Sequence, residues 1–182
     1  LKAYMELAVI SSSAGMLSDA FSKRKFEYTK VAYGVQQQQP RWKRALSFVQ
    51  GIMGEAVGKL YVQKYFPESS KERMVQLVKN LQSAFAQRIE ENTWMTAATK
   101  AKALEKLQAF DIKIGYPDKW QNMDSVFVIH EAKSLLDNVK NVQEAASKYI
   151  ISKRWGKPVD KKLWHMTPQT VNAYYDPSTN SI

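Results

Sequence analysis

The two histidines are the first residues to test for catalysis, because histidine is both a common metal ligand and the usual general base near neutral pH. His130 and Glu131 are the first two residues of a zinc-binding helical pattern in which a second histidine follows four residues after the first. Ser134 stands at that position, so the pattern is incomplete. We therefore predict that His130 begins a helix, with Glu131 placed favourably in its first turn, and that it binds no metal.

Other catalytic arrangements are also incomplete. His165 lies between Trp164 and Met166, where a packed side chain is the expected role, and a Ser-His-Asp triad would need one of the two histidines. The sequence has no GxSxG nucleophile motif, and its closely spaced glycines lack the Lys-Ser/Thr ending of a phosphate-binding loop. It contains no cysteine, which excludes disulfides, thiolate zinc sites and cysteine nucleophiles. We therefore predict no catalytic residue and no metal ligand in this chain.

The composition is that of a folded domain with a basic surface. Hydrophobic residues make up 45% and charged residues 24% of the 182 residues, as in globular proteins. The net charge of +10 would suit a basic helical module that binds nucleic acid or an anionic surface without catalysis, and we keep this as an alternative function. The lysines and arginines are spread along the whole chain, however, which favours solvated helix faces over a binding groove.

Hydrophobic spacing predicts a mainly α fold, whose helices would position any site. Apolar residues recur every three or four positions in several segments, and the expected helices cover residues 1–13, 18–34, 41–65, 69–89, 96–110 and 131–154. Ser69 and Glu72 have the spacing of a capping box, and Thr96 is placed to cap the next helix. We expect no internal repeat and no linker between these helices.

The helix expected at 41–65 is the longest, and two of its features make packing predictions. Trp42 lies on its apolar stripe, so we expect this side chain in the core and expect its removal to destabilise the fold. Gly51, Gly54 and Gly58 each weaken a helix interior by about 1 kcal/mol relative to alanine. Their spacing therefore predicts the close approach of another helix.

The last stretch is predicted to leave the helical pattern. Thr167 and Pro168 indicate a single turn, and the β-branched and aromatic residues of 171–175 then predict a strand. Residues 176–180, with the sequence Asp-Pro-Ser-Thr-Asn, are typical of a turn that returns the chain into a second strand. Only two residues follow that turn. We therefore expect a C-terminal edge strand or an incomplete hairpin, with unpaired backbone groups.

Four blocks carry a resemblance to a known family. They occur in the family's order and extend over nearly the whole chain, at residues 40–44 (PRWKR), 54–66 (GEAVGKLYVQKYF), 113–120 (KIGYPDKW) and 167–175 (TPQTVNAYY). Together they resemble the neprilysin family of zinc metalloendopeptidases. Because it has no cysteine, the chain resembles bacterial members of the family more than the disulfide-bonded animal enzymes. The family's HExxH helix, its downstream glutamate ligand and its late catalytic histidine have no counterpart in these residues.

The resemblance implies a fragment of a zinc-dependent metalloendopeptidase that ends before the HExxH motif. Residues 1–165 would be the helical lobe, and 166–182 the start of the catalytic domain. In the family, the Asn and Ala of the NAYY block bind the substrate backbone, so Asn172 and Ala173 are the predicted substrate-binding residues. Zinc would be bound in the full-length protein and not by this chain, which alone would be inactive.

The same resemblance implies the partners. They would be peptide substrates and the remaining catalytic portion of the same protein, with no nucleic acid and no membrane segment in this chain. An extracytoplasmic location, periplasmic or secreted, is the corresponding expectation.

Overall fold

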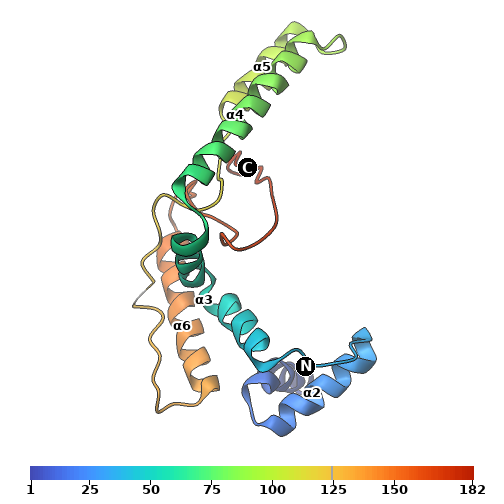
Figure 1. Cartoon of the computed structure of the whole chain (residues 1–182), viewed down its shortest axis with the longest axis vertical. Helices are drawn as coiled ribbons and strands as arrows, with labels where there is room; N and C mark the ends of the chain where they lie inside the picture. The colour runs from blue at the N-terminus through green and yellow to red at the C-terminus, as the bar shows by residue number, and fades with distance from the viewer. Residues whose placement is uncertain (124) are drawn as a thin grey trace. The chain divides into compact units, whose positions relative to one another are not determined.

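The chain is mainly helical, as the spacing of its apolar residues predicts. A computed structural model describes residues 1–123 and 125–182. In this part of the chain the elements are α1 (Lys2–Ser13), the 3₁₀ turn η1 (Ala14–Met16), α2 (Asp19–Tyr33), α3 (Arg41–Tyr65), α4 (Glu68–Glu91), α5 (Ala97–Gln108) and α6 (Leu135–Arg154) (Figure 1).

Local capping chemistry accounts for several of the helix ends. The Thr96 side chain accepts a hydrogen bond from the Thr99 amide at the start of α5, and Gly34 closes α2 in the left-handed conformation. The α6 helix begins at Leu135 rather than at 131, because Ser134 caps it by accepting from the Asp137 amide.

The capping box predicted for α4 is wrong. Pro67, with φ −66° and ψ 154°, is the residue before the helix, and Glu68 already lies in its first turn. Ser69 and Glu72 therefore both lie inside the helix. A capping box needs its serine at the residue before the helix, and Pro67 occupies that position. Glu68 itself is favourable there, since a carboxylate stabilises a helix N-terminus.

The chain divides into two compact units. Unit 1 comprises Leu1–Met53 and Asn122–Trp155, and unit 2 comprises Gly54–Gln121 and Gly156–Ile182. The division falls inside α3, where Met53 has the non-helical dihedral angles φ −123° and ψ 34°. The predicted bounds of this helix are confirmed, but its backbone is interrupted at Met53.

Unit 1 contains exposed apolar side chains on its first helices, and Trp42 is one of them. The Trp42 side chain is 63% exposed, so its predicted place in the core is wrong. It lies in the first turns of α3, where Leu46 on the same stripe is exposed as well. The buried residues of this unit are instead Ala14 in η1, Val126, and Val139, Val142 and the polar residue Asn138 on α6.

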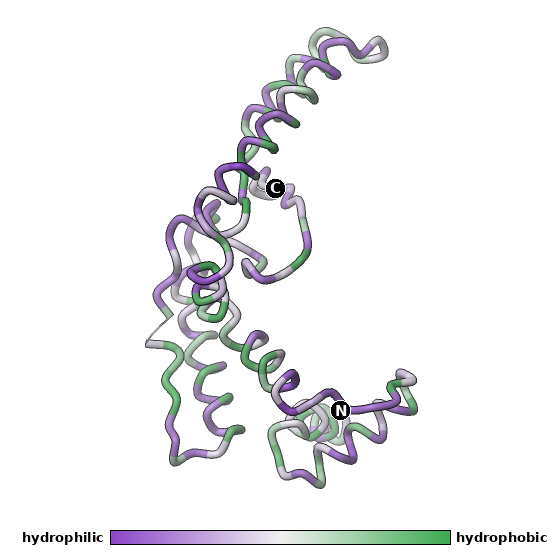
Figure 2. Tube along the Cα trace, in the orientation of Figure 1, coloured by the Kyte–Doolittle hydropathy of each residue, from purple (hydrophilic) through white to green (hydrophobic). Residues whose placement is uncertain are grey.

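Unit 2 contains the hairpin of α4 and α5, which lie side by side (Figure 1). Hydrophobic and hydrophilic residues alternate along both helices (Figure 2). Ile89 of α4 and Leu107 of α5 are buried, whereas Leu77, Leu81 and Phe85 on the α4 stripe are exposed. The predicted core-facing stripe is therefore buried in this structure only near the end of α4.

The C-terminal strand prediction is not confirmed. Residues 171–175 run without a strand partner, and Val171 is fully exposed. The pairing described for this region consists of isolated bridges, antiparallel between Asp176 and Ser181 and parallel between Asp111 and Ser181. The predicted turn at 176–180 is present, and it closes directly onto Ser181. β-propensity alone does not make a strand, because a strand needs a partner for its backbone groups.

Candidate functional site

The candidate site is the segment of residues 163–181, which we call the C-terminal loop. It contains His165, Asn172 and Ala173, and it lies entirely within unit 2. Three parts of the same unit hold it: the section of α3 from Gly54 onward, the end of α5, and the extended residues 111–113 that follow α5.

The loop docks on α3 at two glycines. A Cβ atom on Gly54 would lie 2.9 Å from Thr167 Cγ2, and one on Gly58 would lie 2.7 Å from Pro168 Cδ. The Gln169 side chain donates from Nε2 to the Gly54 carbonyl at 3.0 Å. The predicted close approach to this helix is therefore confirmed at Gly54 and Gly58, but the C-terminal loop makes it rather than another helix.

Gly51 differs from the other two glycines, since nothing lies within 4 Å of its Cβ position. The prediction of close approach is wrong at this position. Gly51 precedes Met53, where the helical conformation of α3 is interrupted, and it belongs to unit 1.

The end of α5 supports the other side of the loop. Asn180, in the left-handed region at φ 52°, donates from Nδ2 to the Lys106 carbonyl at 3.0 Å. Its Oδ1 accepts a hydrogen bond of 3.1 Å from the Tyr175 hydroxyl. The Tyr175 ring also contacts Phe110, with 5.8 Å between the ring centroids. One asparagine thus joins a carbonyl at the end of α5 to the loop.

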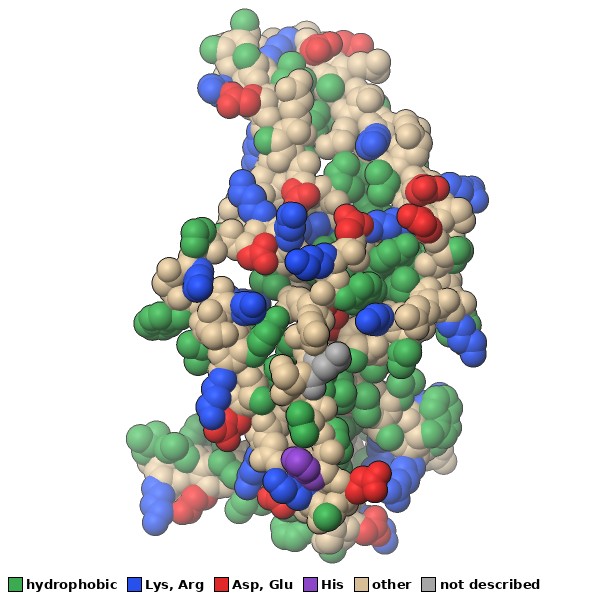
Figure 3. Space-filling model, turned by 90° about the vertical axis from the view of Figure 1, so that its left-hand side faces the viewer, with side chains coloured by type: hydrophobic (Ala, Val, Ile, Leu, Met, Phe, Trp, Pro, Cys, Tyr) green, Lys and Arg blue, Asp and Glu red, His purple; other side chains and the backbone are tan. Residues whose placement is uncertain are grey.

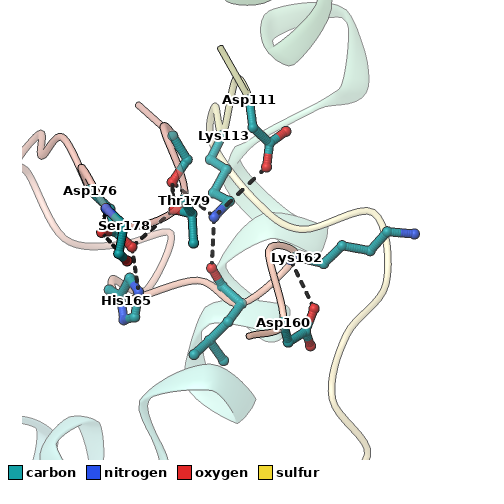
Figure 4. Close-up of polar contacts among 10 residues, drawn as sticks. Asp111, Lys113, Asp160, Lys162, His165, Asp176, Ser178 and Thr179 are labelled. Carbon is teal, nitrogen blue, oxygen red and sulfur yellow. Dashed lines mark hydrogen bonds and ion pairs between the residues drawn. The ribbon is translucent and has the colours of Figure 1, made fainter. Parts of the chain in front are cut away.

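Lys113 lies at the base of the loop. Its side chain is 5% exposed, and Nζ donates to the Leu163 carbonyl at 3.0 Å and to Ser181 Oγ at 3.1 Å (Figure 4). The Lys113 amide also donates to the Ile182 carbonyl at 2.7 Å. Asp111 adds two backbone hydrogen bonds, from its amide to the Asn180 carbonyl and from the Ile182 amide to its own carbonyl, both at 3.0 Å.

Asp176 organises the turn that closes the loop. Its carboxylate accepts from the Ser178 hydroxyl at 2.6 Å, from the Ser178 amide at 2.9 Å and from the Thr179 hydroxyl at 3.0 Å. These hydrogen bonds, the Ser178 hydroxyl first, lower the pKa of Asp176 to about 2, and His165 adds to the effect. The His165 ring lies with Nε2 3.6 Å from the carboxylate (Figure 4). The ring also packs edge-on against Tyr174.

The two histidines have different surroundings. His130 belongs to unit 1 and His165 to unit 2. Within residues 1–123 and 125–182, no three His, Cys, Asp or Glu side chains are grouped so that they could hold a metal ion. His130 and Glu131 precede α6, so the prediction that His130 begins a helix with Glu131 in its first turn is wrong. Its amide and carbonyl are hydrogen-bonded to the Asn138 side chain at 2.8 and 2.9 Å.

Asn172 and Ala173 lie in the exposed part of the loop. Asn172 Oδ1 accepts a hydrogen bond from the Ala173 amide at 2.8 Å, and the Asn172 amide donates to the Thr170 carbonyl at 3.1 Å. These local bonds give the backbone a defined turn, and the exposed carboxamide remains within reach of a ligand. Their role in binding substrate stays a prediction.

A second cluster in unit 2 fixes residues 113–120. Gly115 has φ 75°, and a Cβ there would overlap the Phe66 ring at the end of α3. Tyr116 contacts Phe66 edge-on and stacks on Trp120, and Lys71 Nζ donates to the Tyr116 carbonyl at 2.8 Å. Three of the four blocks that carry the family resemblance, 54–66, 113–120 and 167–175, therefore pack within one unit.

Sequence reasoning missed Lys113, Ser181 and Asn180. A single lysine between two isoleucines gives no local signal of burial, and its side-chain partners are 50 and 68 residues away. The one usable sign was that Lys113 begins a block shared with the family.

A matching family model establishes the class of protein. The model described as peptidase family M13 matches residues 1–117, so the chain belongs to peptidase family M13. This confirms the resemblance to the neprilysin family. Over all 182 residues the chain is 33% identical to a neutral endopeptidase of Lactobacillus helveticus and covers 28% of that protein. It is 34% identical to neprilysin-1 of Trittame loki, with 89% of this chain and 23% of the relative aligned.

Solved structures show the same relationship. The zinc metalloprotease Zmp1 of Mycobacterium tuberculosis, crystallised with an inhibitor, is 43% identical and superposes with a TM-score of 0.82 over 94% of this chain and 25% of its own. PepO of Lactobacillus rhamnosis is 27% identical, with a TM-score of 0.83 over 94% of this chain and 27% of its own. The chain thus spans about a quarter of the length of the relatives it matches.

Nucleic-acid binding by a basic module is not favoured. On the face shown in Figure 3, Lys and Arg side chains are scattered and interspersed with Asp and Glu. Among the residues that the structure describes, five salt bridges join residues three or four positions apart on helices, such as Lys23 with Asp19 and Lys148 with Glu144. Such pairs are typical of solvated helix surfaces.

Proposed function

We propose that this chain is part of a zinc-dependent metalloendopeptidase that hydrolyses peptide bonds. Residues 1–165 would form its helical lobe, and 166–182 would begin its catalytic domain. The observation that carries the proposal is the docking of the C-terminal loop on α3 through blocks shared with the family, in a chain 43% identical to a protein named a zinc metalloprotease.

The residues described here do not fit a zinc ion. Within 1–123 and 125–182 the only histidine and carboxylate in contact are His165 and Asp176, and they do not make a set of three ligands. We therefore assign zinc binding to parts of the protein outside these 182 residues, which span only a quarter of the relatives.

The contribution proposed for the C-terminal loop is to bind the substrate backbone through Asn172 and Ala173. An extended peptide can pair with exposed main-chain groups, so its affinity depends little on its side chains. Residues 171–173 are exposed and have no strand partner, and the Asn172 carboxamide can both donate and accept. Peptides are accordingly the proposed substrates.

From its membership of peptidase family M13, we propose an extracytoplasmic location, periplasmic or secreted, for the protein. Each helix in the described part of the chain is too short or too polar to cross a lipid bilayer.

The proposal is tested by peptide cleavage with the protein encoded by the complete reading frame that contains these residues. We expect cleavage of internal bonds in a fluorogenic peptide, loss of activity with a zinc chelator, and recovery when zinc is added back. Cleavage that persists after exhaustive chelation, or no cleavage across a varied peptide library, would contradict it.

A further inference from the structure

We propose that Lys113 is a positioning residue that clamps the two ends of the C-terminal loop and thereby holds Asn172 and Ala173 in their binding conformation. The substrate half of this inference rests on the function proposed above. The clamp itself rests on contacts within unit 2.

The Lys113 ammonium group is hydrogen-bonded to both ends of the C-terminal loop. Nζ donates to Leu163, the first residue of the loop, and to Ser181, the last (Figure 4). One side chain therefore joins two points that are separated in sequence by the whole loop. Removing either contact weakens the attachment of one end of the segment that contains Asn172.

The burial of Lys113 makes these contacts strong. An ammonium group has three donors and no acceptor, and two of its donors are used by the loop ends. The nearest carboxylate, of Asp111, lies 3.9 Å from Nζ, and the side chain is only 5% exposed. Hydrogen bonds from a charged donor are about twice as strong as neutral ones, and a buried charge without partners is costly. Opening either end of the loop would leave this charge underpaired.

Ser181 is the partner that links the clamp to the turn. It is completely buried, and its hydroxyl also lies 2.8 Å from the Thr179 hydroxyl, which donates to Asp176. Its amide and carbonyl pair with the carbonyl and amide of Asp176 at 3.2 and 2.9 Å. The clamp thus continues through Ser181 into the turn that ends next to Tyr175.

The part of the loop that stays free is the part proposed to bind substrate. Thr167, Pro168 and Gln169 are held on α3, and Asn180 is held on α5. Between these points, residues 170–173 are exposed. Because the chain is held on both sides of residues 170–173, the backbone conformation of these residues depends on where the flanking residues are held.

The experiment uses the full-length protein and three variants. Lys113→Met removes the ammonium group while keeping an unbranched side chain, and Ser181→Ala removes one partner with little change in volume. Lys100→Met is the matched control, because Lys100 is a half-buried lysine of the same unit whose ammonium group donates to the Glu90 carbonyl instead of to the loop. Amide hydrogen exchange and the steady-state kinetics of peptide cleavage are measured for each.

We expect the Lys113 and Ser181 variants to accelerate amide exchange within residues 164–182, with α4 and α5 unchanged. We expect KM to rise roughly tenfold for Lys113→Met, which corresponds to about 1.4 kcal/mol, and less for Ser181→Ala. The value of kcat should stay within about twofold, because ground-state and transition-state binding are lost together. Lys100→Met should change neither the exchange in 164–182 nor KM.

Each outcome decides a separate claim. Unchanged exchange in 164–182 for both loop variants overturns the clamp, whether or not the protein cleaves peptides. Faster exchange with an unchanged KM overturns the positioning role. A wild-type protein that cleaves no peptide overturns the proposed function and the positioning role, while exchange still decides the clamp. If Lys113→Met does not fold, the exchange and KM of Ser181→Ala decide both claims.

Discussion

The side-chain hydrogen bonds within unit 2 join residues far apart in sequence, whereas the side-chain hydrogen bonds around the buried Asn138 within unit 1 join residues close in sequence. In unit 2, side chains join residues far apart in sequence, as between Gln169 and Gly54, which are 115 positions apart, or Asn180 and Lys106, which are 74 apart. In unit 1, the buried Asn138 is hydrogen-bonded to His130, only eight positions away. The blocks shared with family M13 at 54–66, 113–120 and 167–175 all belong to the unit with the distant contacts.

This difference predicts at which positions a substitution should reduce stability. A residue that serves a distant contact has to fit atoms from another segment, so glycine or a particular polar group is required there. A residue on an exposed helix face has only to be compatible with the helical backbone conformation. Pairs of matched substitutions, one in each unit, should therefore differ in their effect on stability.

The largest difference is expected between Gly115→Ala and Gly34→Ala. Both glycines have positive φ, 75° and 68°, so alanine is strained by about 1 to 2 kcal/mol at either position. At Gly34 nothing lies within 4 Å of the new Cβ, whereas at Gly115 it would overlap the Phe66 ring. We expect a loss of about 3 kcal/mol or more for Gly115→Ala and of about 1 kcal/mol for Gly34→Ala, as measured by urea unfolding. Equal losses would show that Phe66 moves aside freely.

The next pair lies on a single helix and should give effects of opposite sign. Gly51→Ala should stabilise the protein by about 1 kcal/mol, because alanine is the better helix former and the site is open. Gly58→Ala should destabilise it by about 1 kcal/mol, because contact with Pro168 and Gln169 outweighs that gain. Urea unfolding of the two variants beside wild type makes the comparison. A stabilised Gly58→Ala variant would mean that the loop is not seated on α3.

Acidification should affect the turn of unit 2 more than the start of α2 in unit 1. The pKa of Asp176 is lowered to about 2 in the folded protein from 3.8, so its contribution to stability is complete above about pH 4 and is lost as the pH falls toward 2. Asp19 also has a lowered pKa, through its hydrogen bond and ion pair with Lys23 on the surface of α2. We expect Asp176→Asn to flatten the decline of Tm between pH 5 and pH 2.5 more than Asp19→Asn does. The reverse order would contradict the hydrogen bonds assigned to Asp176.

The smallest effect is expected for Trp42→Ala in unit 1. Because the Trp42 side chain is 63% exposed, its loss should change the free energy of unfolding by about 0.5 kcal/mol or less. If the free energy of unfolding instead fell by several kcal/mol in thermal or urea unfolding, Trp42 would be a core residue as the sequence predicted. The two units would then differ less.

The sequence predicted the helices well because their signals are local. Arg41–Tyr65 follows from the apolar spacing, and the ends at Gly34 and Thr96 follow from capping chemistry, whereas the Ser134 cap of α6 was missed. What could not be predicted depends on distant partners. The strand at 171–175 failed because its propensity has no second strand to pair with, and the burial of Lys113 depends on Leu163 and Ser181. At the site, Asn172 and Ala173 came only from the family resemblance.

The most direct test of the account is the effect of Asn172→Ala on peptide cleavage by the full-length protein. Asn141, exposed on α6 in unit 1, provides the matched control Asn141→Ala. We predict that kcat/KM falls by roughly 10- to 100-fold for Asn172→Ala, the range for losing one hydrogen bond to a bound peptide, and is unchanged for Asn141→Ala. An active enzyme whose kcat/KM is the same with Asn172→Ala would contradict the assignment of the C-terminal loop to substrate binding.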